Sequence, residues 1–271
     1  MSAPRGPWYY RLARSIALRV IPQPTPPISW QGDFADWAGA RSACAGYSED
    51  AIVARAVAAA REVVAGRAAF DRDGVAFAER EYAWPMLASL LYVAATRGSL
   101  HVVDVGGSLG STYRQHLPVL PDTIDLHWHV VEQEPIARVG AAEFTTPDLT
   151  FSSSLADGDL ASADVALFGS SLCYLEDPGA FLDALADAEV GFLLIDRTPF
   201  LVEDDGRHHV AAQIVRGEDG AVRESYPCWI FSRSALERDL AESWEMVGDW
   251  WVSDLQPVPD PIHLGSLWRR R

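Results

Sequence analysis

The sequence predicts an α/β fold in which helices cover both faces of a mostly parallel sheet. From Leu100 onward, short apolar runs that are typical of buried strands alternate with segments of helical spacing. The first run ends in an acid and a glycine-rich turn, and a helix can begin directly after it. Two late strands follow a closing helix, which predicts an antiparallel hairpin at one edge of the sheet. Strands that are apolar throughout and alternate with helices indicate a sheet that is buried on both faces.

The strands can be placed from these runs and from the polar residues that end them. After the strand that begins at Leu100, we expect strands at 126–133, 149–151, 164–168 and 190–195, and the closing pair at 245–252 and 263–268. Asp177 followed by Pro178 predicts the start of one helix, because an aspartate caps and a proline fits the first helical position. Ser232 predicts the cap of the closing helix.

We divide the chain into three segments. They are a basic N-terminal segment with a proline-rich linker at 1–27, a helical cap at 28–99, and the core at 100–271 with an insert at about 201–229. A cap in this position commonly covers the ligand pocket.

Within the first two segments, the pattern predicts helices from Ser48 to about Ala65 and from Pro85 to Thr96. The aromatic stretch W-Q-G-D-F-A-D-W at 30–37 is expected to be an ordered loop. The basic stretch at 7–20 can contact an anionic membrane surface, or it is a short helix that is frayed or docked on the acidic body of the protein.

Charge and cysteine usage exclude several classes of protein. The net charge of −16 argues against a general nucleic-acid binder, which would need a basic face. The 3 cysteines are scattered without a C-x-x-C pair, so we expect neither a disulfide framework nor a metal site, and a reducing compartment. No apolar run approaches the ~20 residues that span a bilayer, and no signal peptide is recognisable. We therefore expect a cytoplasmic protein; the oligomeric state is not indicated.

The glycine-rich turn is the strongest local signal. It has the pattern D-x-G-G-x-x-G, with Asp104 two residues before Gly106 and Gly107. Glycines let the backbone turn sharply and approach a ligand, and Gly110 would let the next helix pack closely on the strand. A dinucleotide loop would place its first glycine at Val105. The pattern found here is instead typical of S-adenosyl-L-methionine (SAM) methyltransferases, in which the acid helps to hold the amino-acid part of the cofactor.

Further cofactor-binding positions follow from the ends of the other strands. Glu132 ends the second strand, where a carboxylate can accept hydrogen bonds from both ribose hydroxyls. We expect the adenine to lie near Gln133, Ser153 and Ser154, and the methionine part near Gly169 and Ser170. Ser108, within the glycine-rich turn, is a further cofactor-binding candidate.

Several motifs together resemble one protein family. They are W-Q-G-D-F-A-D-W, D-V-G-G-S-L-G, W-H-V-V-E-Q, L-C-Y-L-E-D-P, L-I-D-R-T-P and Y-P-C-W-I-F-S, which extend over most of the chain, from about Trp30 to Trp251. The sequence resembles a family of class I SAM-dependent methyltransferases often encoded among surface-polysaccharide biosynthesis genes. The resemblance implies a Rossmann-like sheet with an antiparallel closing hairpin, and SAM as cofactor at Asp104, Gly106, Gly107 and Glu132. It implies little about the acceptor.

The insert supplies the candidates for catalysis. Methyl transfer to an oxygen acceptor needs a group that takes the acceptor's proton, and histidine suits that role near neutral pH. His208 and His209 are the expected bases, with Asp196 as an orienting or second basic group. The alternative is that the two histidines belong to a solvated turn. We interpret His127 and His129 as packing or surface residues, because no third metal ligand is visible at a suitable spacing.

The acceptor-binding candidates are aromatic residues and one cation. Aromatic faces can stack on a sugar or an aromatic ring, although aromatics in caps are more often part of the core. An arginine after the fifth strand can hold an acidic group or pair with Asp196. The expected set is Tyr82, Tyr174, Arg197, Tyr226 and Trp229.

The sequence thus predicts a methyltransferase, and we expect it to methylate an oxygen of a small molecule or glycan precursor. Two alternatives remain. One is a protein of the same fold without turnover that binds the cofactor as a partner in a biosynthetic assembly. The other is a nicotinamide reductase, which Val105 and the closing hairpin disfavour.

Overall fold

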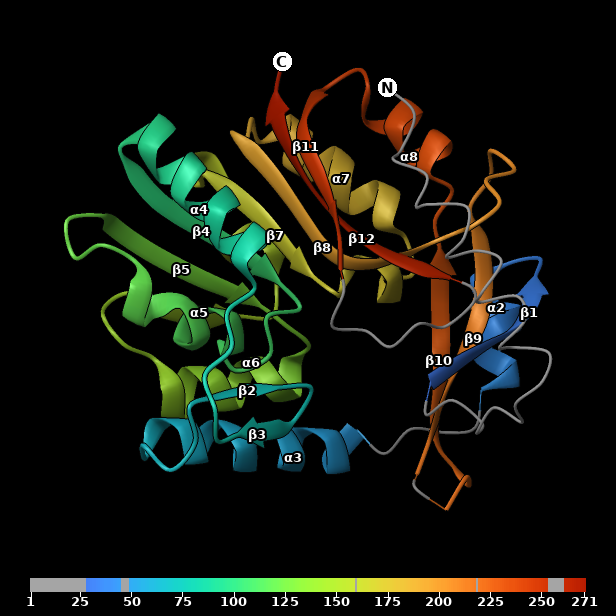
Figure 1. The fold of residues 1–271 in the computed structure, drawn as a ribbon, viewed down its shortest axis with the longest axis horizontal. Helices are drawn as coiled ribbons and strands as arrows, with labels where there is room; N and C mark the ends of the chain where they lie inside the picture. The colour runs from blue at the N-terminus through green and yellow to red at the C-terminus, as the bar shows by residue number, and fades with distance from the viewer. Residues whose placement is uncertain (1–27, 45–48, 159, 218, 253–260) are drawn as a thin grey trace, which may run out of the picture.

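The architecture is described from a computed structural model that places residues 28–44, 49–158, 160–217, 219–252 and 261–271. A seven-stranded sheet forms its centre, in the order β6-β5-β4-β7-β8-β12-β11 (Figure 1). The strands are β4 (Ser99–Val105), β5 (Asp125–Val131), β6 (Leu149–Ser152), β7 (Val165–Gly169), β8 (Phe192–Phe200), β11 (Trp244–Trp251) and β12 (Ile262–Arg270).

Strand direction confirms the predicted sheet, which is mostly parallel and has an antiparallel closing hairpin. β4 pairs in parallel with both β5 and β7, β5 pairs in parallel with β6, and β7 pairs in parallel with β8. β12 is antiparallel to β8 and to β11, which makes the expected closing hairpin. The chain runs outward from β4 to β6 and then returns to β7, so strand order reverses between β4 and β7. Open α/β sheets bind ligands at the carboxyl ends of the strands beside such a reversal.

Helices cover both faces of this sheet, as expected. On one face, α4 (Trp84–Arg97) packs through Leu87, Leu90 and Val93 against β4, β8 and β12, and α5 (Ser111–His116) adds Tyr113. On the other face, α7 (Pro178–Asp187) and α8 (Arg233–Leu240) bury leucines against the same strands. The α7 and α8 residues in this second core are Leu182, Leu185, Leu236 and Leu240.

The predicted helix caps are present. The side chain of Asp177 accepts a hydrogen bond from the Ala180 N–H at the start of α7, and Ser232 accepts one from Ala235 N–H at the start of α8. A proline stands in the first turn of α4, as expected from Pro85. The starts of these helices can be predicted from local sequence, because each cap satisfies backbone N–H donors that the helix itself leaves unpaired.

The N-terminal part is not purely helical, and that expectation is wrong for three segments. Ile28–Phe34, which includes most of the expected loop at 30–37, is strand β1. It pairs with β9 (His209–Arg216), which also pairs with β10 (Val222–Ile230), and the three strands form a separate antiparallel sheet. α2 (Trp37–Ala43) lies against this sheet, to the right in Figure 1. The expected insert therefore contains two strands, of which β9 pairs with a strand from the N-terminal part of the chain.

A small hairpin accounts for the other two segments. β2 (Phe70–Arg72) and β3 (Val75–Phe77) pair between α3 (Glu49–Val64) and α4, and the Phe70 and Phe77 rings stack at 4.7 Å. α3 confirms the first expected cap helix, while its expected cap Ser48 lies outside the described residues. The segment at 1–27, with its basic stretch, lies outside them as well. In the part of the chain that is described, no helix is long and apolar enough to cross a membrane.

Candidate functional site

Asp104 is the most deeply buried carboxylate at the carboxyl edge of the central strands. It is 1% exposed, and its Oδ2 accepts a hydrogen bond of 3.0 Å from Trp128 Nε1 on the neighbouring strand. Its Oδ1 is also buried and has no hydrogen-bond partner among the described residues. Burial raises the pKa of Asp104 to about 7; the Trp128 hydrogen bond acts against this rise, and the negative charge of Glu132 adds to it. A buried acceptor without a partner is costly, so it indicates a place where a donor from a ligand fits.

The two glycines after Asp104 are required by close contacts. A Cβ on Gly107 would lie 2.4 Å from Asp104 Oδ2, so the backbone there packs directly on the carboxylate. Gly106 has a φ of +75°, and its Cβ would lie 2.4 Å from the Cβ of Ser171. Any other residue would displace the loop at both positions. The predicted glycine loop thus has the close backbone approach for which glycine is needed.

Glu132 joins the end of β5 to this loop. Its Oε1 accepts a hydrogen bond from Ser108 N–H at 3.0 Å, and its Oε2 accepts one from Gln133 N–H at 2.8 Å. Ser108 has a φ of +54°, which is unusual for a residue with a side chain, and the bond to Glu132 helps to hold it there. Burial raises the pKa of Glu132, whereas the two backbone donors lower it. The second strand therefore presents its carboxylate to the loop, where the sequence placed it.

The end of β7 lies against the same loop. Ser170, with a φ of +72°, donates its N–H to the Asp196 carbonyl oxygen at 2.9 Å, and the hydroxyl of Ser171 donates to the Val105 carbonyl oxygen. These two bonds connect the carboxyl ends of β4, β7 and β8. A Cβ on Gly169 would meet only Thr112 and the tip of Met86 at 3.8 and 4.0 Å, which are ordinary contacts.

Ser171 is a residue of the site that sequence reasoning missed. It contacts Gly106 and bonds to Val105, although the prediction stopped at Ser170. Its position directly after the two predicted residues was the available signal. The predicted Ser153 and Ser154 are exposed and follow β6, and Ser154 Oγ accepts from Ala156 N–H at 3.2 Å.

The structure does not bring the predicted catalytic residues into one cluster. The Oδ1 of Asp196 accepts a hydrogen bond of 2.9 Å from Trp250 Nε1 on β11. The ring of His209 lies between Asp33 Oδ1 and Asp205 Oδ2, each at 2.9 Å. The ring of His208 accepts from the Ser232 N–H at 3.1 Å through Nδ1, and its Nε2 lies 3.0 Å from Asp239 Oδ2. Both ring nitrogens of each histidine therefore have partners within the protein, and these contacts fix the start of the insert. The general-base role of the histidines stays a prediction.

Asp204 organises the same turn from its other side. It accepts hydrogen bonds from Gly206 N–H at 3.0 Å, from Ser234 N–H at 2.8 Å and from the hydroxyl of Ser232 at 2.5 Å. Burial alone would raise the pKa of Asp204, but these donors lower it to about 2. The turn before β9 is therefore fixed to the start of α8.

The fifth strand of the core is longer than the sequence indicates. β8 continues to Phe200 because β12 pairs with it as far as that residue, so Asp196 and Arg197 lie within the strand and not after it. The pairing is irregular opposite Gly265, and Arg197 has a φ of +52° there. Its Nη2 lies 3.8 Å from Asp73 Oδ2 in the turn between β2 and β3.

The aromatic candidates separate into two groups. Tyr174 Oη donates a hydrogen bond of 2.5 Å to Gln213 Oε1 on β9, and its ring meets that of Tyr226 edge-on at 5.6 Å. Trp229 donates through Nε1 to the Leu175 carbonyl oxygen at 3.0 Å, in the same region. Tyr82 instead lies before α4, 5.3 Å from the ring of the exposed Trp84. Gln213 was not predicted, because nothing in its sequence context marks it.

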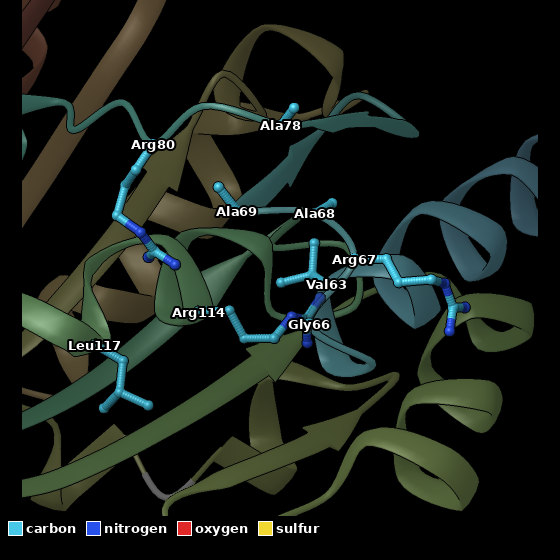
Figure 2. A pocket seen from close by; sticks show the side chains of 9 residues that line it. All are labelled: Val63, Gly66, Arg67, Ala68, Ala69, Ala78, Arg80, Arg114 and Leu117. Atoms are coloured by element: carbon cyan, nitrogen blue, oxygen red, sulfur yellow. The ribbon is translucent and has the colours of Figure 1, made fainter.

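A cavity of about 500 Å³ lies outside the glycine loop, between the end of α3, the β2–β3 hairpin and α5 (Figure 2). Arg67, Arg80 and Arg114 line it. The Arg67 side chain extends away from the other two and pairs with Glu62 at 2.7 Å. Arg114 is held by the Leu109 carbonyl oxygen at 2.5 Å and by Asp71 at 3.3 Å. The guanidinium groups of Arg67 and Arg114 are therefore both held by partners within the protein.

No protein-family model and no curated protein sequence matches the chain. The solved structures with a similar fold include SAM-bound CalS10, an amino pentose methyltransferase from Micromonospora echinaspora, which is 14% identical over 78% of this chain and 96% of that chain, with a TM-score of 0.43. They also include a SAM-dependent methyltransferase from Mesorhizobium loti, which is 16% identical over 69% and 97%, with a TM-score of 0.45. At this distance the likeness says nothing of activity.

Proposed function

We propose that the protein is a SAM-dependent methyltransferase that acts on an oxygen of a small-molecule or glycan acceptor. The observation that carries this proposal is the buried, unpartnered Oδ1 of Asp104 beside a loop whose Gly106 and Gly107 leave no space for a side chain. Glu132 completes the group from the next strand. All of these residues lie where strand order reverses, which is where a nucleoside ligand binds in this class of sheet.

The residues present fit SAM. Asp104 Oδ1 would accept from the ammonium of the methionine part, because that oxygen is buried without a donor. Glu132 would accept from the ribose hydroxyls, since a carboxylate has about four lone-pair sites and two are used by backbone N–H groups. Ser108, Gly110, Gly169 and Ser170 would line the methionine part, and Gln133, Ser153 and Ser154 the adenine. When bound, SAM supplies the methyl group of its sulfonium.

The main contribution of this chain would be alignment of the acceptor and exclusion of water. Holding two reactants in line can lower a barrier by ~7–11 kcal/mol. The acceptor's proton would go to His208 or His209, with Asp196 as the second group once its hydrogen bond from Trp250 is released. Either ring would first have to release one of its present partners, which are Asp33 and Asp205 for His209. This requirement makes the histidines testable apart from the cofactor site.

The acceptor would be recognised by aromatic faces and one cation. Tyr174, Tyr226 and Trp229 form one group, and Tyr82 lies at the start of α4. Such faces stack on a sugar or on an aromatic ring. Arg197 would take an acidic group of the acceptor, exchanging its contact with Asp73 at 3.8 Å. Both a polysaccharide precursor and an aromatic natural product fit this description.

A turnover assay tests the proposal against the second candidate, a cofactor-binding partner without catalysis. SAM labelled in its methyl group is incubated with the protein and a panel of sugars, sugar nucleotides and phenols. We expect label in at least one acceptor. SAM binding without transfer to any member of a broad panel would favour the partner role, which the engaged histidine rings already support. Failure of a folded protein to bind SAM would contradict both.

A further inference from the structure

A second cavity, of about 450 Å³, lies on the sheet face opposite α4 and α5. His101, His127 and His129 line it, all from β4 and β5. Successive side chains of a strand point to opposite faces, and the neighbours of His101, Leu100 and Val102, are in the core under α4. The three imidazoles are therefore on the other face, at a distance along the strands from the glycine loop.

Strand register brings two of these histidines together with a carboxylate. His101 on β4 is directly paired with His127 on β5, and Asp125 begins β5 two residues earlier on the same face. The two imidazole rings meet edge-on, with centroids 4.6 Å apart and an angle of 85° between their planes. His101 is not recognisable from the sequence as a ligand that joins His127, because the parallel pairing of β4 with β5 cannot be seen from spacing along one strand.

The distances in this group suit a cation better than they suit hydrogen bonds. The Nε2 of His127 lies 3.4 Å from Asp125 Oδ1, and the Nε2 of His101 lies 3.7 Å from Asp125 Oδ2. Both separations exceed the range of ~2.7–3.2 Å for a good N–H···O bond. Zinc bonds of ~2.0–2.1 Å in tetrahedral geometry separate neighbouring ligand atoms by roughly 3.3–3.4 Å. The three potential ligand atoms all lie within 4.8 Å of one another.

Burial differs among the three side chains in a way that also fits a ligand site. The Nε2 of His101 is buried and has no hydrogen-bond partner in the described part of the chain. The side chains of Asp125 and His127 are 70% and 58% exposed, so a cation and its water can enter from solvent. His129 is different, because its nitrogens lie 2.8 Å from the hydroxyls of Thr150 and Ser152.

We propose that His101, Asp125 and His127 bind one Zn²⁺ ion, with water in the fourth position. Two imidazoles and a carboxylate form a ligand set that suits zinc, whereas magnesium and calcium prefer oxygen ligands alone. The ion would tie β4 to β5 near the start of both strands. The site does not depend on the proposed methyl transfer, since it lies near the start of β4 and β5, away from their carboxyl ends, and shares no residue with the glycine loop.

Calorimetric titration of the untagged, chelator-treated protein with zinc chloride tests the site. We expect one ion per chain and a thermal midpoint that rises with zinc concentration. The variants His101→Gln, His127→Gln and Asp125→Asn are each expected to weaken binding by about tenfold or more, because even loss of an outer partner of a ligand costs ~10–100-fold. His129→Gln is the matched control, on the same strand and face, and should bind as the wild type does.

The visible spectrum of the wild-type protein with Co²⁺ gives a second measurement that needs no variant. Four-coordinate Co²⁺ with two imidazoles gives intense d–d bands that zinc then displaces. Unchanged zinc affinity in all three ligand variants would overturn the proposal, as would an equal loss in His129→Gln. Magnesium binding as tight as zinc binding, or Co²⁺ bands of only octahedral intensity, would also overturn it.

Discussion

Replacing Asp104 by asparagine should make the protein more stable at alkaline pH, although it removes a residue of the proposed site. The asparagine keeps an oxygen for Trp128 Nε1, and its amide group fills the position of the unpartnered Oδ1. Burial raises the pKa of Asp104 from 3.8 to about 7 in the folded protein. The carboxyl group is therefore neutral in the folded state at pH 5, where it is mostly ionised in the unfolded chain.

The sign and size of the effect follow from this difference in pKa. Because the folded pKa is raised, stability from the neutral carboxyl is fully present below about pH 4 and is lost as pH rises through about 7. Each pH unit in this window costs ~1.36 kcal/mol. From pH 5 to pH 8 the wild type should therefore lose roughly 2–3 kcal/mol more than Asp104→Asn. This pKa already includes the repulsion between Asp104 and Glu132.

Urea unfolding of both proteins at pH 5, 6, 7 and 8 measures this difference. The free-energy difference between variant and wild type should grow steadily over these values and level off above pH 7. Titrating groups that do not interact with Asp104 cancel, because both proteins share them. A difference that is independent of pH would refute the reasoning, since it would mean that Asp104 ionises as it does in water. At pH 8 the variant should also bind S-adenosylhomocysteine more weakly. The ionised Asp104 carboxylate would then destabilise the fold and contribute to ligand binding.

Three further predictions concern single side chains. Trp128→Phe removes the donor to Asp104 Oδ2 and should lower the free energy of unfolding by about 1–3 kcal/mol at pH 8, with a smaller loss at pH 5, in the same urea assay. Asp204→Asn should reduce the loss of stability that the wild type shows as pH falls from about 4 to 2. The folded pKa of Asp204 is about 2, so its ionised carboxylate stabilises the fold above about pH 4 and this stabilisation is lost toward pH 2. Thermal midpoints of both proteins measured between these pH values test this. His209→Gln should lower kcat by ~10²–10⁴ if the ring is the base, and should otherwise lower the thermal midpoint through lost contacts with Asp33 while leaving the pH profile of kcat unchanged.

Elements that depend on local signals could be predicted from the sequence. The strands of the central sheet are apolar runs, and the caps Asp177 and Ser232 act within one helical turn. The glycine loop was recognised from its local pattern D-x-G-G-x-x-G. The structure explains two of its glycines, because a Cβ on Gly107 would meet Asp104 and a Cβ on Gly106 would meet Ser171. Asp104 and Glu132 were found from their place at strand ends, which the parallel sheet brings to one edge.

Features that depend on long-range pairing could not be predicted. β1 is a strand because β9 provides its hydrogen bonds, and most of the chain separates the two. His101 meets His127 only through the register of β4 with β5. Asp196 was expected to act with the histidines of the insert, yet Trp250 on the closing hairpin takes its side chain. In each case the partner belongs to an element that no local pattern connects with the residue.

The central claim is that Asp104, the glycine loop and Glu132 form a SAM site, and calorimetric titration with S-adenosylhomocysteine tests it most directly. Wild type, Glu132→Ala and Glu134→Ala are compared, because Glu134 is a neighbouring carboxylate that is exposed. We predict binding that Glu132→Ala weakens by about 1.5–3 kcal/mol, or ~10–150-fold, and that Glu134→Ala leaves unchanged. Equal affinity of all three proteins, or no binding by the folded wild type, would contradict the account.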